Sequence, residues 1–350
     1  MTEKVRIKDI AEKSGVSVGT VDRVLHNRPN VSKKAREKVE KVLKEINYQP
    51  NMYASALAYN KSYQFYCIIP QHDSEAYWEE IEDGTAKACD FHISTEIMYY
   101  QRYDIKSFVQ TTKECLEKKP NGVIVVPADI KVTKHFCETM HERKIPFILL
   151  DSYIPDVNPL TFFGQDSFSS GKFAAKMLML LAANDKEIML FKRMKNGKVA
   201  SRQQENRELG FRHYMNEHFP NVRIAELDVP VEGSPESNEK KLEQFFSAHP
   251  GIRNCITLGS KAHIVGEFLL KTNRRSVQIM GYDMVEKNAQ CLRKGSISFL
   301  IAQHAYMQGY HCVDSLFKAI VLHKKVDPTN YMPIELLSKE NVDFYRRTQL

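Results

Sequence analysis

Polar and aromatic side chains recur just beyond a series of apolar segments in this 350-residue chain. Carboxylates, amides and hydroxyls offer a polyhydroxylated ligand both acceptors and donors, and aromatic rings stack on the C–H faces of a sugar. Any one such residue alone is ordinary in a solvated loop, so it is the recurrence that indicates a binding site. The candidate ligand-binding residues are His72, Asp73, Trp78, Asp151, Asp166, Arg207, Ser260, Asp283 and Gln303.

The segments before these residues have the pattern of buried parallel strands separated by amphipathic helices. The helical stretch 105–118, for example, places Phe108, Thr112, Cys115 and Leu116 on one face. Alternating strands and helices predict α/β lobes with doubly wound parallel sheets, which bind ligands at the carboxyl ends of their strands. About 290 residues exceed one comfortable core, so we expect two lobes. The predicted strands are Phe65–Ile69, His92–Met98, Gly122–Val126, Phe147–Leu150, Ile188–Phe191, Ile224–Asp228, Asn254–Leu258 and Val277–Gly281.

The N-terminal region carries a different chemistry, because it holds nearly all of the excess positive charge. Residues 1–61 contain 13 Lys and Arg against 7 Asp and Glu, a net +6 out of +7 for the chain. The other 289 residues hold 37 basic and 36 acidic side chains. A small basic head on a nearly neutral body indicates nucleic-acid binding.

The pattern of the head predicts an all-α fold of three short helices. The first begins at Ile7 and ends before Gly15, where the backbone must turn with positive φ. Ser17 caps a second helix, about Val18–His26, and Ser32 caps a third. Two helices joined by a tight glycine turn and closed by a third form a helix-turn-helix, whose second helix enters the major groove. The alternative is a plain three-helix domain that binds no DNA.

The head resembles that of the LacI/GalR family of bacterial repressors. The matching segments are Val5-Arg6-Ile7-Lys8-Asp9-Ile10-Ala11, Gly15-Val16-Ser17, Thr20-Val21, Arg23-Val24-Leu25, Val31-Ser32, Arg36-Glu37-Lys38-Val39 and Asn47-Tyr48-Gln49-Pro50-Asn51. The family usually has Ser in place of Asp22, which would have to pair with Arg23 or Arg28 or accept from a cytosine amino group. Together, the head pattern and the resemblance imply DNA contacts from Ser17, Val18, Gly19, Thr20, Arg23, Asn30, Ser32, Asn51, Ala54 and Leu57.

Residues 51–61 read as a hinge helix or linker. Eight residues, Asn51 to Ala58, would not hold a helix alone in water, and an ordinary tether is the alternative. The resemblance implies that this segment folds on DNA, where two copies pack in the minor groove. Leu57 matches the leucine that wedges between base pairs and kinks the duplex.

The body resembles, more thinly, the effector-binding core that this family shares with periplasmic sugar-binding proteins. The matching residues are Gly122-Val123-Ile124-Val125, Ile148-Leu149-Leu150-Asp151, Asp166 with Gly171, Arg207 with Gly210-Phe211, Gly281-Tyr282-Asp283, and Gln303. The resemblance implies that Asp151, Arg207 and Asp283 contact ligand hydroxyls. Ser260 stands where many relatives have Asn or Asp. The alternative for Arg207 is a surface ion pair with Glu205 or Glu208.

These observations predict three parts. A helix-turn-helix domain spans residues 1–50, a hinge spans 51–61, and a two-lobe effector-binding and dimerisation domain resembling periplasmic binding proteins spans 62–350. Lobe 1 is expected at about 62–162 and 297–325, and lobe 2 at about 163–296 and 326–345.

Other chemistries fit poorly. Six residues separate Gly164 from Gly171, where a phosphate loop needs four. His135, Cys137 and His141 lack zinc-site spacing. We therefore expect no catalytic residues, no metal and no cofactor. No apolar run reaches membrane length, no signal peptide is evident, and the seven cysteines are scattered, which favours a cytoplasmic, nucleoid-associated bacterial protein with reduced thiols.

The leading interpretation is a sequence-specific transcriptional regulator, a homodimeric repressor of an inverted-repeat operator in double-stranded DNA. A small-molecule effector, a sugar or sugar derivative, would control its operator affinity allosterically. One alternative is a DNA-tethered enzyme acting on a sugar or nucleotide, which would turn over its ligand. The other is an architectural DNA-binding protein without an effector, whose DNA affinity would respond to no small molecule.

Overall fold

A computed structural model describes residues 7–25, 29, 31–45, 62–72, 76–89, 93–199 and 201–345 of the protein. The chain divides into two compact units, Met1–Lys61 and Ser62–Leu350. The boundary falls where the charge balance of the sequence changes. No helix in the described ranges is both long and apolar enough to cross a membrane.

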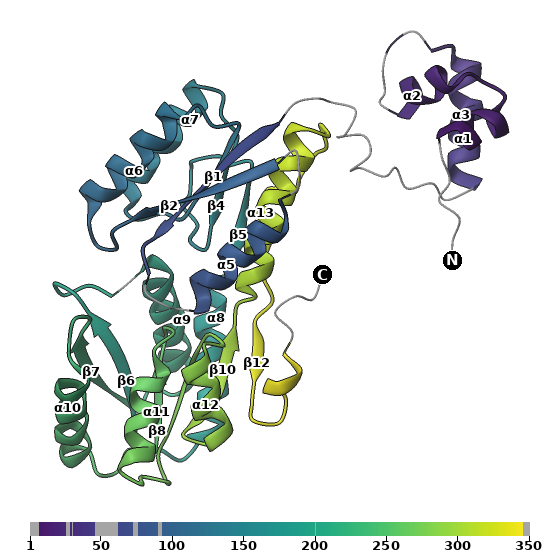
Figure 1. Ribbon diagram of the computed structural model, residues 1–350. Helices are drawn as coiled ribbons and strands as arrows, with labels where there is room; N and C mark the ends of the chain where they lie inside the picture. Colours follow the sequence, from purple (N-terminus) through teal and green to yellow (C-terminus); the bar gives the residue numbers. More distant parts are fainter. Residues whose placement is uncertain are drawn as a thin grey trace. The chain divides into compact units, whose positions relative to one another are not determined.

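The N-terminal unit contains three helices, α1 (Ile7–Ser14), α2 (Val18–Leu25) and α3 (Lys33–Glu45) (Figure 1). Gly15 has φ +63°, the left-handed conformation that ends α1 and turns the chain into α2. The Ser17 hydroxyl accepts a hydrogen bond from the amide of Thr20 at 3.1 Å, which caps α2 as predicted. The three helices enclose a small apolar core made of Ile10, Ala11, Val21, Val24, Val39 and Val42.

The first lobe of the body is built on a parallel sheet of order β11-β5-β4-β3-β1-β2. Helices α5 (Ala76–Lys87) and α13 (Ala305–Ile320) cover one face of this sheet, and α6 (Ile105–Glu117) and α7 (Ile130–Glu142) cover the other (Figure 1). Its strands are β1 (Tyr63–Pro70), β2 (Ile93–Tyr100), β3 (Gly122–Val125), β4 (Phe147–Leu150), β5 (Thr161–Gly164) and β11 (Asn330–Tyr331).

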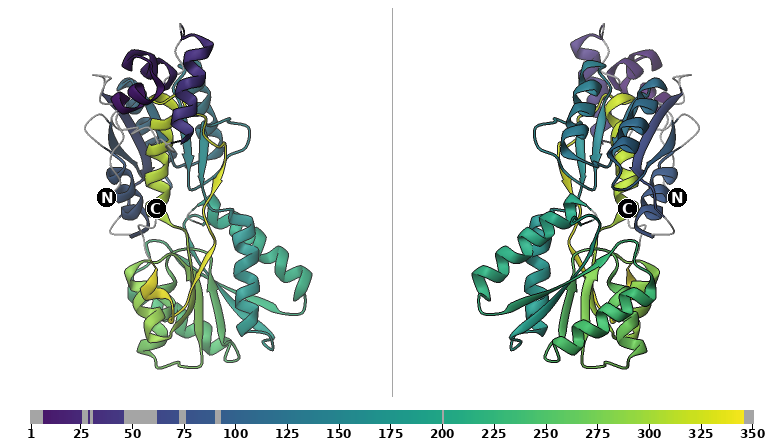
Figure 2. Two further views of the ribbon diagram at one scale, coloured as in Figure 1. Left: turned by 90° about the vertical axis from the view of Figure 1, so that its right-hand side faces the viewer. Right: turned by 90° about the vertical axis from the view of Figure 1, so that its left-hand side faces the viewer.

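The second lobe is built on a sheet of order β12-β10-β9-β8-β6-β7, parallel except for β12. Figure 2 shows the two lobes, one above the other, joined by several chain crossings. Its strands are β6 (Glu187–Met194), β7 (Arg223–Pro230), β8 (Asn254–Thr257), β9 (Gln278–Tyr282), β10 (Ile297–Ala302) and β12 (Glu335–Leu337). Its helices are α8 (Ser167–Leu181), α9 (Arg202–His218), α10 (Pro235–Ala248), α11 (Ala262–Lys271) and α12 (Glu286–Lys294), and the 3-10 turn η1 (Val342–Phe344) follows β12.

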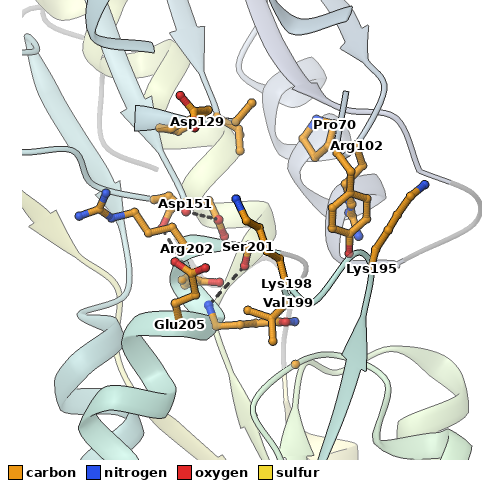
Figure 3. Close-up of a pocket in the computed structure, with 18 of the residues that line it drawn as sticks. Pro70, Arg102, Asp129, Asp151, Lys195, Lys198, Val199, Ser201, Arg202 and Glu205 are labelled. Atoms are coloured by element: carbon orange, nitrogen blue, oxygen red, sulfur yellow. Dashed lines mark hydrogen bonds between the residues drawn. The ribbon is translucent and has the colours of Figure 1, made fainter. Parts of the chain in front are cut away.

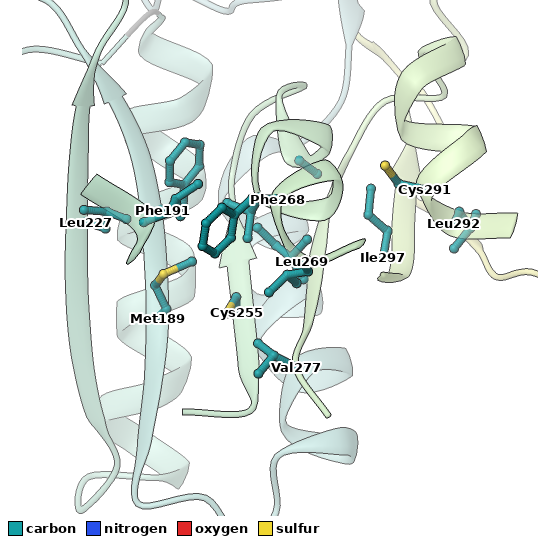
Figure 4. Packing of buried hydrophobic residues seen from close by; sticks show 14 of the residues in the cluster. Met189, Phe191, Leu227, Cys255, Phe268, Leu269, Val277, Cys291, Leu292 and Ile297 are labelled. Carbon is teal, nitrogen blue, oxygen red and sulfur yellow. The ribbon is translucent and has the colours of Figure 1, made fainter. Parts of the chain in front are cut away.

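Apolar side chains fill both faces of the second sheet. Figure 4 shows one of these layers, where Met189 and Phe191 of β6 lie near Phe268 and Leu269 of α11. On the opposite face α8 and α9 pack against each other. Gly171 of α8 makes this contact possible, because a Cβ there would overlap the main chain of Arg207. The close approach therefore fixes the position of α9 and of Arg207.

The lobe boundaries predicted from the sequence need correction. β10 pairs with β9 in the second sheet, with Ile297 opposite Ile279, so the segment from residue 297 does not belong as a whole to lobe 1. The chain crosses only after Ala302, and α13 then packs on the first lobe. The short strand β11 pairs with β5, so the chain returns to lobe 1 at residues 330–331. Sequence reasoning missed β5, β11 and β12, which are four residues long or shorter, and it also missed β10, although five of its six residues are apolar.

Candidate functional site

A cavity of about 470 Å³ lies between the two lobes of the body. It is lined by residues that follow β1 to β4 of the first lobe, by residues that follow β6, β8 and β9 of the second, and by the start of α9 (Figure 3). The carboxyl ends of both sheets therefore face the same space, as expected for open α/β sheets. Trp78, Asp151, Arg207, Ser260, Asp283 and Gln303, all predicted from the sequence, line it.

Asp151 is a buried carboxylate at the end of β4. Tyr77 donates a hydrogen bond to its Oδ1 at 2.5 Å, and Ser152 donates to its Oδ2 at 3.1 Å. Burial raises the pKa of Asp151, an effect opposed by the Tyr77 hydrogen bond and by the positive charge of Arg207. Asp151 has φ 67° and Asp283, after β9, has φ 69°. Left-handed non-glycine residues are strained and cluster at functional sites.

Arg207 is 1% exposed and anchors a polar network behind the cavity. Its Nη1 donates to the carbonyl of Leu258 at 3.1 Å, its Nη2 donates to Oε1 of Gln303, and its guanidinium lies 3.9 Å from the ring centre of Tyr282. Gln303 Nε2 in turn donates to Oδ1 of Asp283. The alternative of a surface ion pair is therefore wrong for Arg207. Its Nε has no hydrogen-bond partner in the described part of the chain.

Asn288 is fully buried beneath the second-lobe side of the cavity and holds its loops in place. Its Nδ2 donates to the carbonyls of Ser260 (2.9 Å), Tyr282 (3.0 Å) and Asp283 (3.0 Å). Its Oδ1 accepts from the backbone amide of His263 at 2.8 Å and lies 3.0 Å from Nδ1 of the same residue. Burial lowers the pKa of His263 to about 4, so this imidazole is neutral near pH 7.

Two predicted ligand contacts, His72 and Asp166, do not line the cavity. His72 lies 2.9 Å from a carboxylate oxygen of Glu82 on α5, and Tyr99 donates to the same oxygen. Asp166 caps α8 by accepting from the amide and hydroxyl of Ser169. In both cases a nearby partner holds the side chain away from the ligand space. Asp73 lies outside the described residues.

Sequence reasoning missed several cavity residues, among them Arg102, Tyr103, Asp129, Lys198 and Arg202. The first three also follow strands, so the rule that found Asp151 could have found them. Lys198 also follows a strand, but β6 runs on to Met194, beyond the end predicted at Phe191, and Arg202 lies at the start of a helix rather than at a strand end.

The residues of α2 and its N-cap that were predicted to contact DNA lie toward the outside of the N-terminal unit. Ser17, Val18, Gly19 and Arg23 are exposed, and Thr20 is half-buried. Ser32 caps α3 by accepting from the amide of Ala35, as predicted. The DNA-binding predictions for Asn30, Asn51, Ala54 and Leu57 fall outside the described residues.

The residues considered for zinc binding are separated by their packing. Cys137 is buried, His141 lies 2.9 Å from the carbonyl of Val157, and His135 lies on the surface beside Glu138. The described ranges contain no group of three or more His, Cys, Asp or Glu side chains placed to hold a metal ion.

Comparison with known structures agrees with this architecture. A crystal structure assigned as a LacI transcriptional regulator from Bacteroides fragilis is 43% identical, with a TM-score of 0.79, and the match covers 82% of this chain and all of that one. The glucose-galactose binding protein of Geobacillus stearothermophilus shares the fold at 18% identity, with a TM-score of 0.69 over 81% of this chain and 99% of that one.

Sequence relatives include two operon repressors. The sucrose operon repressor of Staphylococcus xylosus is 27% identical over 51% of this chain and 54% of that protein, so the match spans about half of its length. The ribose operon repressor of Halalkalibacterium halodurans is 24% identical over 79% of this chain and 80% of that protein. The periplasmic binding protein domain family matches residues 65–325, and the family described as bacterial regulatory proteins, lacI family, matches residues 6–51. With a lacI-type helix-turn-helix unit and a two-lobe body of the periplasmic-binding-protein kind, the chain belongs to the lacI family of bacterial regulatory proteins.

Proposed function

We propose that this protein is a homodimeric transcriptional repressor whose affinity for an inverted-repeat DNA operator is set by a small carbohydrate bound between its two lobes. The observation that carries the proposal is the polar cavity at the strand ends of a body joined to a helix-turn-helix unit. Sequence relatives named as sucrose and ribose operon repressors support a carbohydrate effector.

The chemistry of the cavity supports a polyhydroxylated ligand. Asp151 and Asp283 supply acceptors for hydroxyl protons, and Gln303 supplies an amide that both donates and accepts. Trp78 and Tyr77, whose rings meet edge to face at 4.9 Å, line the same space and offer apolar faces for sugar C–H groups. A cavity of this size accommodates a mono- or disaccharide.

The crossings between the lobes support coupling between ligand and DNA binding. Gln165, at the first crossing, donates through Nε2 to the carbonyls of Ala302 (3.2 Å) and Pro333 (2.8 Å) at the other two. The three crossings are thus hydrogen-bonded together, so closure of one lobe on the other moves them as a set. A ligand with different affinity for open and closed arrangements then shifts DNA affinity by a coupling of about 1–3 kcal/mol.

Operator binding by the full chain, measured with and without a panel of sugars, tests the proposal. We expect one class of sugar to change operator affinity by about fivefold or more, in line with such coupling. Arg207→Ala, which empties the centre of the polar network, should abolish the response while effector-free operator binding stays close to native. Asp151→Asn removes a charge at constant shape and should weaken the response, whereas Asp166→Asn, a carboxylate outside the cavity, should not.

The outcomes separate the proposed function from its alternatives. If Arg207→Ala and Asp151→Asn respond as the native protein does, the cavity is not the effector site. A native protein that responds to no sugar contradicts effector control and favours the architectural role. Chemical turnover of a bound sugar would instead favour an enzyme.

A further inference from the structure

The second-lobe wall of the cavity carries a short basic segment, residues 195–202, between β6 and α9. Lys195 and Lys198 pair through their backbones at 2.9 and 3.0 Å, around a two-residue turn with φ 52° at Asn196 and 73° at Gly197. Asn-Gly is the sequence that best tolerates two left-handed residues in such a turn. Arg202 follows in the first turn of α9. The turn and the helix thus place Lys195, Lys198 and Arg202 on one wall (Figure 3).

Two of these cations have no protein partner in the described part of the chain. Lys195 forms an ion pair with Glu232 at 2.6 Å and lies over the ring of Tyr103. Its charge therefore already has protein partners. Lys198 and Arg202 make no side-chain hydrogen bond or ion pair there. The Nε of Arg202 is also buried and lacks an acceptor. A ligand anion that binds the charged ends of these two side chains would gain charge-assisted hydrogen bonds without breaking a protein ion pair.

The carboxylates that share the cavity make their hydrogen bonds with groups other than the basic segment. Asp104 and Asp129 cap α6 and α7 by accepting from backbone amides, and Asp151 accepts from Tyr77 and Ser152. Asp283 accepts from Gln303. Glu205 remains, but it is exposed in water. None of these carboxylates forms an ion pair with Lys198 or Arg202 among the described residues, so the two cations keep local, unpaired positive charge beside the cavity. The start of α9 adds the positive end of a helix dipole.

We propose that the effector carries an anionic group, a carboxylate or a phosphate, in addition to its hydroxyls, and that Lys198 and Arg202 hold this group. An acidic sugar fits both ends of the cavity. Its hydroxyls meet Asp151, Asp283 and Gln303, and its anion meets the basic segment. This inference rests on the proposed function, because it names the chemical class of the effector for the same site.

Paired ligands test the inference on the full chain. Binding to native protein is measured by calorimetry for galactose against galacturonate, glucose against glucuronate, and glucose against glucose 6-phosphate. We expect an acidic member to bind about tenfold tighter or more than its neutral partner, equivalent to about 1.4 kcal/mol. Comparing the affinities of the two uronates with that of glucose 6-phosphate identifies whether a carboxylate or a phosphate is the preferred anion. The preference should shrink as salt rises from about 0.05 to about 0.5 M, because salt screens partly exposed charges.

Charge variants then locate the anion site. Lys198→Gln and Arg202→Gln should each weaken binding of the acidic sugar about tenfold and leave the neutral sugar unchanged. Glu205→Gln removes the nearby carboxylate and should tighten binding of the acid. Lys176→Gln, on the exposed side of α8, is the matched control and should change neither.

The failure of this inference is distinct from the failure of the proposed function. A native protein that binds neutral sugars as tightly as acids, with Lys198→Gln and Arg202→Gln unchanged for both, overturns the anion site and leaves effector control standing. A native protein that binds neither class overturns both.

Discussion

The buried pair of His263 and Asn288 predicts a specific loss of stability in acid. The pKa of His263 is lowered from 6.5 to about 4, chiefly by burial and also by the positive charges of Lys261, Lys287 and Arg193. His263 therefore becomes protonated near pH 6.5 in the unfolded chain but only near pH 4 in the folded chain. The folded state therefore suffers no penalty from His263 above pH 6.5, and its free energy of unfolding falls as the pH drops from 6.5 toward 4.

The size of the effect follows from the two pKa values. Between pH 7.5 and pH 4.5 the pair should cost the folded state about 2.5 kcal/mol, because one pKa unit corresponds to about 1.4 kcal/mol. His263→Asn keeps an N–H near the position of Nδ1 but does not titrate, so it should lack this part of the pH dependence. Urea unfolding of the body, residues 62–350 within the full chain, measures the free energy of unfolding at both pH values for the native protein and the variant. His213→Asn, an exposed histidine on α9, is the control.

If native protein and His263→Asn lose the same stability between the two pH values, within about 0.5 kcal/mol, then His263 accepts a proton in the folded state without cost. Success would carry a functional consequence. Asn288 holds the backbones of Ser260 and Asp283, so protonation beside it should also weaken effector binding in mild acid.

Three further predictions test other parts of the molecule. Arg23→Ala removes an exposed side chain from α2 and should weaken specific operator binding by about 1–3 kcal/mol per half-site without unfolding the head; unchanged affinity in a gel-shift titration would show that α2 does not contact the bases. Leu57→Ala should abolish DNA bending, followed by energy transfer between labelled duplex ends, while weak, salt-sensitive binding persists; a tightly bound but unbent operator with the native protein would contradict the proposed wedge. Gly171→Ala places a Cβ against the main chain of Arg207 and should destabilise the body by about 1–3 kcal/mol in urea unfolding, whereas Gly251→Ala, with open space around it, should not.

The alternation of strands and helices was sufficient to predict the class of fold and the edge where the site lies. Buried parallel strands are continuous apolar runs, and their carboxyl ends share one edge, so Asp151 and Asp283 could be placed there from sequence. The lobe boundaries could not be placed in the same way. Whether β10 joins the first or second sheet depends on its pairing with β9, a long-range contact with no local sequence signal.

The direction in which side chains point could not be predicted from the sequence either. His72 and Asp166 both follow strands, yet each is held by a partner outside the cavity. For Asp166 a local signal existed, since Asp directly before an apolar helix is a preferred N-cap residue. Asn288 could not have been found, because its role depends on carbonyls that three loops bring together.

Gln303 connects the ligand cavity to the crossings. Its Oε1 accepts from Gln203 and Arg207, both on α9 of the second lobe, while its backbone carbonyl accepts from Gln308 on α13, which packs on the first. A ligand hydroxyl that binds Asp283 competes with Nε2 of Gln303 for the same carboxylate. On the proposed function, we therefore expect effector binding to change the hydrogen bonds of Gln303, the residue at which the chain passes between the lobes. One side chain would thus take part both in effector recognition and in the hydrogen bonds that set the geometry of the crossings.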